Sequence, residues 1–192
     1  LDRSSAASDV YKRQADHAIA RHDPDLVGKE DRFLQLLDAV VQRQARLVAQ
    51  WMGTGFIHGV MNTDNMTLSG ETIDYGPCAF MEAFDPQTVF SSIDTHGRYA
   101  FGNQPAMAHW NLARLAEALL PLIDPNPDQA VLRATRVLDR FESHFNDHWL
   151  AVHRAKLGLE AASDDEADRK LINDYLQGLH RHGVDFTLGW RR

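Results

Sequence analysis

Apolar residues recur at intervals of three and four along most of the chain, a spacing that predicts amphipathic helices. The clearest stripe predicts a helix over residues 31–52, which ends where Gly53 and Gly55 follow. A short helix is predicted over 15–22, because the residue before Pro24 is pushed out of the helical region. The stripe of the longer helix is formed by Phe33, Leu37, Val40, Leu47 and Trp51.

Three further helices are predicted in the second half of the chain. The first begins near Pro105, a residue suited to a first helical turn, and runs to the proline-rich break at 124–128. A long amphipathic helix follows over residues 129–157. The last helix begins with a capping box, in which Ser163 and Glu166 satisfy each other's free backbone amides.

The segment between these helical regions is polar and interrupted. Two short β-capable stretches, 66–68 and 72–75, are joined through Gly70 and predict a hairpin. Residues 76–104 carry Gly, Pro, Asp, Ser and Asn throughout and predict an irregular loop. Loops of this length in a compact domain are usually functional or mobile. The predicted fold class is therefore α+β and predominantly α-helical.

The first residues stand apart from this pattern. Residues 1–14 have neither the apolar core of a signal peptide nor a helical stripe, so we expect a disordered tail or an artefact of the sequence end. The first residue is Leu1 rather than methionine, which suggests a piece of a longer protein. With 192 residues and 44% hydrophobic content, one domain over 15–192 is the default.

Charge and cysteine content narrow the possible partners. The net charge is −7 and the basic residues are scattered, which argues against nucleic acid or an anionic membrane as a partner. An ATP-like anion would need metal ions or local basic groups to bind here. No run of about 18 apolar residues is present, so no membrane span is predicted. The single cysteine, Cys78, cannot form an intrachain disulfide, which fits a reducing compartment.

One polar stretch, HGVMNTDNM at 58–66, points to specific chemistry. His58 and Asn65 have the seven-residue spacing of the H-x-D-x-x-x-x-N catalytic loop of kinases, and a later Asp-Tyr-Gly run beginning at Asp74 stands where D-F-G would. Val60 occupies the usual position of the base, whereas a carboxylate, Asp64, lies next to the asparagine.

These residue types suit phosphoryl or nucleotidyl transfer from a nucleoside triphosphate. Hard cations such as Mg²⁺ prefer oxygen ligands, so the amide oxygen of Asn65 and the carboxylate of Asp74 could hold one or two ions across a triphosphate. A nearby carboxylate, Asp64, could then orient and deprotonate an attacking hydroxyl. Asn and Asp also favour turns, so Asp64 and Asn65 have a purely structural alternative. The spacing together with Asp74 favours the site.

Four stretches, HGVMNTDNM, TIDYGP, GRYAFGNQPA and WNLARLAEALLPL, resemble the selenoprotein O family of protein adenylyltransferases. The resemblance extends in weaker form from residue 15 to 192. It implies the C-terminal lobe of a protein-kinase-like fold, with a small β-hairpin carrying the metal site. It also implies a bacterial cytoplasmic protein that binds ATP in a flipped orientation and transfers AMP to protein Ser, Thr or Tyr hydroxyls with release of pyrophosphate. The implied base is Asp64, and Asn65 and Asp74 are the implied ligands of Mg²⁺ or Mn²⁺ and of the ATP it carries.

The chain also departs from that family. The N-terminal lobe, with its nucleotide-binding lysine, has no counterpart, so we expect a C-lobe fragment that is inactive or weak alone. Many bacterial members carry a cysteine where this chain has Ser91 and Ser92, whereas Cys78 falls where phenylalanine is common, which argues against redox control by a disulfide. The alternatives are a non-catalytic, pseudokinase-type domain that binds nucleotide or protein, and a conventional phosphotransferase. Val60 in the base position argues against the latter.

Several other polar residues have structural interpretations that we prefer. We expect His58 to shape its loop rather than to catalyse, and Arg98 and Tyr99 could anchor the long loop as easily as contact a substrate. His144 and His148 have an i, i+4 spacing that could bind zinc, but no glutamate directly follows His144 as in a metalloprotease helix, and no further ligand cluster is evident. We therefore expect surface histidines there.

Overall fold

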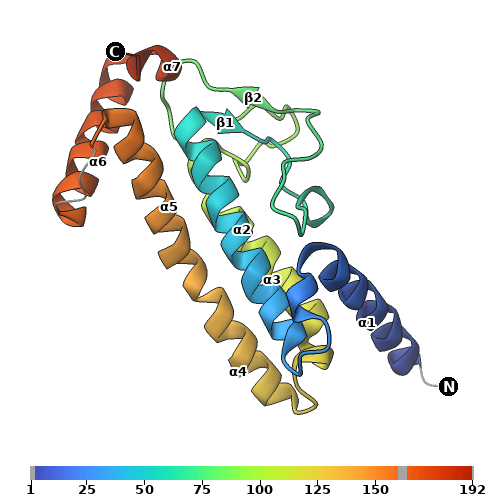
Figure 1. Cartoon of the computed structure of the whole chain (residues 1–192). Helices are drawn as coiled ribbons and strands as arrows, with labels where there is room; N and C mark the ends of the chain where they lie inside the picture. The colour runs from blue at the N-terminus through green and yellow to red at the C-terminus, as the bar shows by residue number, and fades with distance from the viewer. Residues whose placement is uncertain (1–2, 160–163, 192) are drawn as a thin grey trace.

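The computed structural model describes residues 3–159 and 164–191, and helices dominate it (Figure 1). One small antiparallel sheet accompanies them, in which Phe56 pairs with Phe80 and Ile57 with Ala79. The predicted class, α+β and predominantly α-helical, is confirmed for the described part of the chain. The helices are α1 (Arg3–His22), α2 (Arg32–Thr54), α3 (Gln104–Ile123), α4 (Pro127–Leu138), α5 (Arg140–Leu157), α6 (Asp165–His182) and α7 (Phe186–Gly189), and the strands are β1 (Phe56–Ile57) and β2 (Ala79–Phe80).

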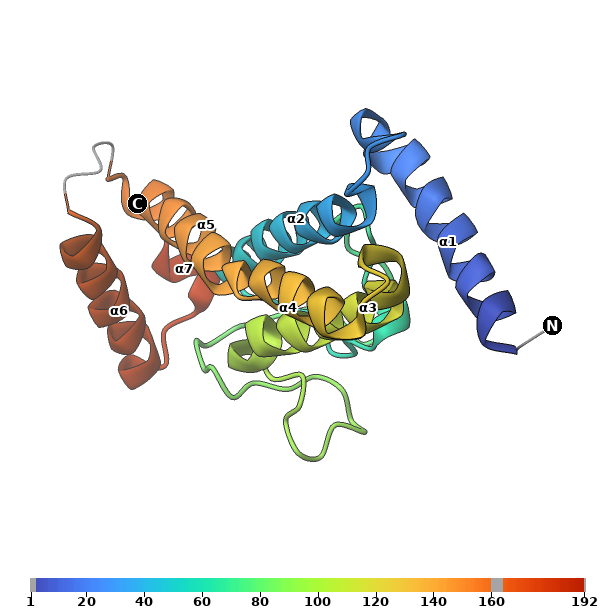
Figure 2. The ribbon, with the colours of Figure 1, turned by 90° about the horizontal axis from the view of Figure 1, so that it is seen from below.

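Helix α2 is the centre of the core. It packs against α3, α4 and α5, which Figure 2 shows from the end of the bundle. Its apolar stripe is buried, and burial of each large aliphatic side chain contributes about 1.5–3 kcal/mol. Gly53 allows the close approach of α5, because a Cβ at that position would lie 2.2 Å from Val152 Cγ1. The buried members on α2 include Leu36, Leu37, Val40, Val41, Ala45 and Val48.

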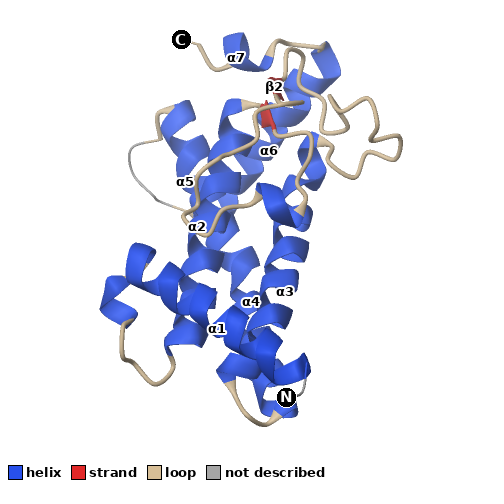
Figure 3. Ribbon diagram, turned by 90° about the vertical axis from the view of Figure 1, so that its right-hand side faces the viewer, coloured by secondary structure: helices blue, strands red, loops and turns tan. Residues whose placement is uncertain are grey.

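The strands and most of the long irregular segment that follows them lie toward one end of this helical bundle (Figure 3). A second apolar cluster holds the long loop there against α6 and α7 and includes Phe84, Phe101, Leu179 and Phe186. A bridge between Ala83 and the residue before α7 adds backbone pairing. The predicted irregular stretch 76–104 is largely confirmed, although it contains β2 and the short 3-10 helix Phe101–Asn103. Within the described ranges, no helix is both long enough and apolar enough to cross a membrane.

Two predicted helix boundaries are wrong. Helix α1 begins at Arg3 and continues through residue 14, so the described part of the segment expected to be a disordered tail or an artefact of the sequence end is helical. Residues 3–14 contain no Pro or Gly and several good helix formers, so propensity extends the helix without an apolar stripe. The helix predicted over 129–157 begins at Pro127 and is divided at Asp139 into α4 and α5. Aspartate is a poor interior residue, yet its φ of −61° and ψ of −20° stay helical, and the two helices continue in nearly the same direction (Figure 1).

The predicted hairpin is also smaller than expected. Of the pairing predicted between 66–68 and 72–75, only an isolated bridge between Met66 and Thr72 is present, and the sheet is formed by β1 and β2 instead. The Thr67 hydroxyl provides the reason, since it accepts a hydrogen bond from the Glu71 N–H (2.9 Å) and donates to the Glu71 carbonyl (2.8 Å). These bonds replace those of a regular ladder.

The start of the last helix differs in its cap. Ser163, expected to cap it, lies outside the described residues. Within them, the Asp164 carboxylate caps α6 by accepting hydrogen bonds from the backbone N–H groups of Glu166 and Ala167. A polar side chain thus caps the helix, as predicted, but it is an aspartate; aspartate and serine are both preferred at this position.

Candidate functional site

The stretch 58–66 leaves β1 and forms a loop beside α2 and α3, with the 3-10 helix Thr63–Asn65 at its far end. His58 begins this loop and is completely buried. Its backbone N–H donates to Gln104 Oε1 at 3.0 Å. The ring Nε2 lies 2.8 Å from the Ile73 carbonyl oxygen, and Nδ1 lies 3.4 Å from the Val60 nitrogen. We assign the proton to Nε2, because a carbonyl oxygen can only accept and the Val60 N–H can only donate.

The bond from His58 to Ile73 joins the two candidate motifs. Ile73 immediately precedes Asp74, so a buried histidine holds the start of the 58–65 loop against the backbone that carries the second predicted metal ligand. This contact confirms the loop-shaping role expected for His58.

Four buried or partly buried side chains fasten the same region to the helices. From α2, Gln44 Nε2 donates to the Thr67 carbonyl (2.6 Å) and Trp51 Nε1 donates to Thr72 Oγ1 (2.9 Å). From α3, Gln104 Nε2 donates to the Phe56 carbonyl (3.0 Å) and Asn111 Nδ2 to the Met61 carbonyl (2.9 Å). The loop has little regular structure of its own, so these bonds satisfy its backbone and set its path.

Residue type and spacing do not identify Gln44, Gln104 and Asn111 as the residues that position the loop. A signal was present, because Gln44 continues the buried stripe of α2, four residues after Val40 and four before Val48. A polar side chain on a buried stripe needs a hydrogen-bond partner. Which partner it finds depends on tertiary structure, so the loop contact itself could not be predicted from spacing.

Asn65 is half-buried and its amide orientation suits a metal ligand. Its Nδ2 donates to the Val60 carbonyl at 2.9 Å, which directs that half of the amide inward. The Oδ1 atom therefore remains as an acceptor for a cation. The Asn65 N–H also bonds to the Asn62 carbonyl (3.0 Å), so the turn-forming interpretation holds for the same residue. Asp64, one residue earlier, is exposed at the tip of the loop.

Asp74 has an unusual backbone. With φ at +57°, it is the one non-glycine residue of 3–159 and 164–191 that has positive φ. Aspartate tolerates this region better than most residues, but strain of about 1–2 kcal/mol is typical. Such outliers are concentrated at functional sites. Its side chain is exposed, and Gly76 leaves space beside it, since a Cβ there would lie 3.6 Å from Asp74 Oδ1.

The structure links these residues through hydrogen bonds between side chains and backbone atoms. A path of hydrogen bonds runs from Asn65 through Val60 and His58 to Ile73, next to Asp74. No group of three or more His, Cys, Asp or Glu side chains in the described ranges could hold a metal ion. One carboxylate and one amide oxygen fit Mg²⁺, which commonly takes one or two protein ligands and completes its shell with water and substrate phosphates.

The long loop reaches the site through Tyr99. Its hydroxyl donates to Asn62 Oδ1 at 2.6 Å, and Asp94 accepts the backbone N–H groups of Arg98 and Tyr99 at 2.8 Å each. The Arg98 guanidinium lies 4.8 Å from the centre of the Trp110 ring on α3. These contacts support the anchoring role for both residues.

In the part of the chain that the structure describes, the histidines of α5 do not belong to any group of three or more His, Cys, Asp or Glu side chains that could hold a metal ion. The expectation of surface histidines is only partly right, because His144 and His148 are half-buried, and burial is the main cause that lowers the pKa of His148. His153 is fully buried, its Nδ1 lies 2.8 Å from the Trp149 carbonyl oxygen, and burial lowers its pKa to about 4. A neutral ring in that position is a core element.

Comparison with known proteins identifies relatives of nearly the whole chain. A family model described as protein adenylyltransferase SelO matches residues 3–191. Proteins called protein nucleotidyltransferase YdiU are similar to it in Chromobacterium violaceum (62% identity over 95% of this chain), Cereibacter sphaeroides (56% over 98%) and Mycolicibacterium smegmatis (56% over 98%). The chain spans 38–39% of the length of these relatives.

Proposed function

Because the chain belongs to the SelO family of protein adenylyltransferases, we propose that it supplies the lobe that carries the base and the metal ligands in the transfer of AMP from ATP to protein hydroxyl groups. The acceptors are Ser, Thr or Tyr side chains, and pyrophosphate is the second product. The names of the relatives support nucleotidyl transfer. The resemblance of the four motifs supports AMP as the transferred group and a kinase-like lobe as the fold.

The observation that carries the proposal is the hydrogen bond from His58 to the Ile73 carbonyl. It couples the loop bearing Asp64 and Asn65 to the backbone bearing Asp74, which two unrelated turns would not require. The positive φ of Asp74 adds support, because the fold maintains a strained conformation at a proposed ligand.

Each residue has a defined chemical role in this proposal. Asn65 and Asp74 hold Mg²⁺ or Mn²⁺, which supplies charge neutralisation on the triphosphate when bound. Asp64, exposed at the loop tip, accepts the proton of the attacking hydroxyl. The hydroxyl oxygen forms a bond to the α-phosphorus while the bond from that phosphorus to the oxygen bridging the α- and β-phosphates breaks, and the electron pair leaves with pyrophosphate.

The chain covers 38% of its Chromobacterium violaceum relative, and we place the rest of the nucleotide site in the part that it does not cover. We therefore expect weak or no transfer by the chain alone, and we expect it to act in the bacterial cytoplasm, as its single cysteine suits a reducing compartment.

The proposal is tested in a chimera, in which this chain replaces the 183 aligned residues of the Chromobacterium violaceum relative. Asp64→Asn should lower AMP transfer by about 10²–10⁴-fold, the typical contribution of a general base, while Mn²⁺ affinity stays unchanged. Glu71→Gln is the matched control, because Glu71 is an exposed acid of the same region that accepts a hydrogen bond from Ser69. The chimera with this substitution should retain AMP transfer. Transfer by Asp64→Asn within about threefold of the parent would remove Asp64 from the mechanism.

A further inference from the structure

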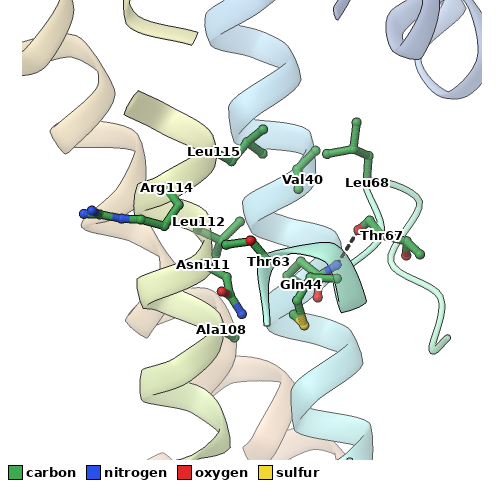
Figure 4. Close-up of a pocket in the computed structure, with 11 residues that line it drawn as sticks. Val40, Gln44, Thr63, Thr67, Leu68, Ala108, Asn111, Leu112, Arg114 and Leu115 are labelled. Carbon is green, nitrogen blue, oxygen red and sulfur yellow. Dashed lines mark hydrogen bonds between the residues drawn. The ribbon is translucent and has the colours of Figure 1, made fainter. Parts of the chain in front are cut away.

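A cavity of about 260 Å³ lies between α2, α3 and residues 63–68, on the inner side of the loop that carries Asp64 (Figure 4). Ligand pockets commonly begin at roughly 300 Å³, so this one suits a molecule about the size of one substituted ring. Most of its walls are apolar, and they include Val40, Met66, Leu68, Ala108, Leu112 and Leu115.

Two amide side chains reach this cavity from opposite helices, Gln44 from α2 and Asn111 from α3 (Figure 4). Both are more than nine-tenths buried, with exposed fractions of 2% and 6%. Their nitrogen atoms already donate to the Thr67 and Met61 carbonyl oxygens. Rotating either amide by half a turn would place its oxygen against a carbonyl oxygen, so both orientations are determined by their partners.

The remaining polar atoms of these two side chains are the amide oxygens. Neither Gln44 Oε1 nor Asn111 Oδ1 has a hydrogen-bond partner among the described residues, and both are closed to water in this conformation, so a donor reaches them only after a neighbouring side chain moves. Buried acceptors without a partner are rare in folded proteins and call for a ligand, an ion or an ordered water. Met66 borders the same cavity, and its unbranched thioether side chain can move aside to admit a donor.

The charges around the cavity indicate a neutral ligand. Arg114 is the one ionised side chain among the residues that line it, and it points away from Gln44 and Asn111 (Figure 4). Its guanidinium forms an ion pair with Glu117 at 2.7 Å and lies 5.1 Å from the centre of the Trp110 ring. No lining carboxylate would balance a cation, and no free lining cation would balance an anion.

We propose that this cavity is a binding site for a neutral, mostly apolar small molecule that carries a primary carboxamide. The two N–H groups of the carboxamide donate to Gln44 Oε1 and Asn111 Oδ1, and the apolar body packs against the aliphatic walls. Thr63 lines the cavity and is adjacent to Asp64, so a bound molecule would contact the inner side of the proposed catalytic loop. Binding at this site does not require ATP or AMP transfer.

The test is a titration of the 192-residue chain, labelled with ¹⁵N, with benzamide, followed by NMR. Benzamide should shift the backbone amide signals of residues 63–68 and 108–115 with a dissociation constant on the order of 1 mM, as expected for a fragment. Methyl benzoate has a similar shape but no N–H group, so it should bind at least about fivefold more weakly.

A pair of variants locates the site. Leu115→Trp fills the cavity from α3 and should abolish the benzamide shifts, whereas Leu171→Trp on the exposed face of α6 should retain them. If Leu115→Trp loses the spectrum of the folded chain, Leu115→Phe repeats the test with a smaller ring. Equal affinity for the two compounds would overturn recognition by the acceptors. Retained binding in the filled variant, or no shifts up to about 20 mM benzamide, would overturn the site and assign both oxygens to ordered water.

Discussion

The side chain of Gln104 offers the sharpest test of how the candidate loop is held in place. It is completely buried, accepts the His58 N–H at 3.0 Å and donates to the Phe56 carbonyl at 3.0 Å. Gln104→Met preserves the length and approximate volume of the side chain while removing both bonds. A buried backbone group without a partner costs about 1–3 kcal/mol, so losing two partners should lower the free energy of unfolding by about 2–6 kcal/mol.

That loss is large compared with the roughly 5–15 kcal/mol by which domains are usually stable. Urea unfolding followed by far-ultraviolet circular dichroism measures it directly. Gln50→Met is the matched control, because Gln50 is exposed on α2 and its change should stay within about 0.5 kcal/mol. If Gln104→Met also stays within about 0.5 kcal/mol, the loop is not held by this amide and the positioning argument is wrong.

Three other outcomes follow from particular contacts. Asp74→Asn keeps a residue that tolerates positive φ, so it should preserve stability. The Mn²⁺ affinity of the chimera should fall at least about tenfold, and an affinity within about twofold of the parent would refute the ligand assignment. His153 has a folded-state pKa of about 4 against an ordinary value of 6.5, so the unfolded chain binds the proton first as pH falls. The stability that depends on the neutral His153 ring should be complete above pH 6.5 and should decline by about 3 kcal/mol between pH 6.5 and pH 4. His153→Gln should remove that part of the pH dependence, and equal pH profiles of the variant and the parent would contradict the assignment. Gly178→Ala, at a position in α6 with open space around it, should raise the free energy of unfolding by about 0.5–1 kcal/mol. Gly53→Ala should lower it, because the new Cβ would meet Val152. A rise in thermal stability for Gly53→Ala would refute the packing of α2 on α5.

Helices were the predictable part of this fold. The stripe of α2 and the proline at the start of α3 predict both helices to within about two residues, because burial on one face imposes the period. Helix α1 was missed over residues 3–14 because it relies on propensity without a stripe. The hairpin was over-predicted because the Thr67 hydroxyl competes with the ladder, a side-chain choice that alternation does not reveal.

The candidate site also has a part that the sequence predicts and a part that only the folded structure reveals. Residue type and spacing could identify Asp64, Asn65 and Asp74 as a set, and these three assignments remain predictions. The contact from His58 to Ile73 and the anchoring by Gln44 and Asn111 depend on segments brought together by folding. Spacing along one chain carries no direct information on such contacts.

AMP transfer is tested most directly by protein labelling by the chimera with α-³²P-ATP and γ-³²P-ATP in parallel, in the presence of Mg²⁺ or Mn²⁺. We expect label from the α-phosphate only, because AMP is transferred and both outer phosphates leave as pyrophosphate. Label from the γ-phosphate alone would mean a phosphotransferase. No label from a chimera that is shown to be folded would mean a domain that keeps the loop without catalysing AMP transfer.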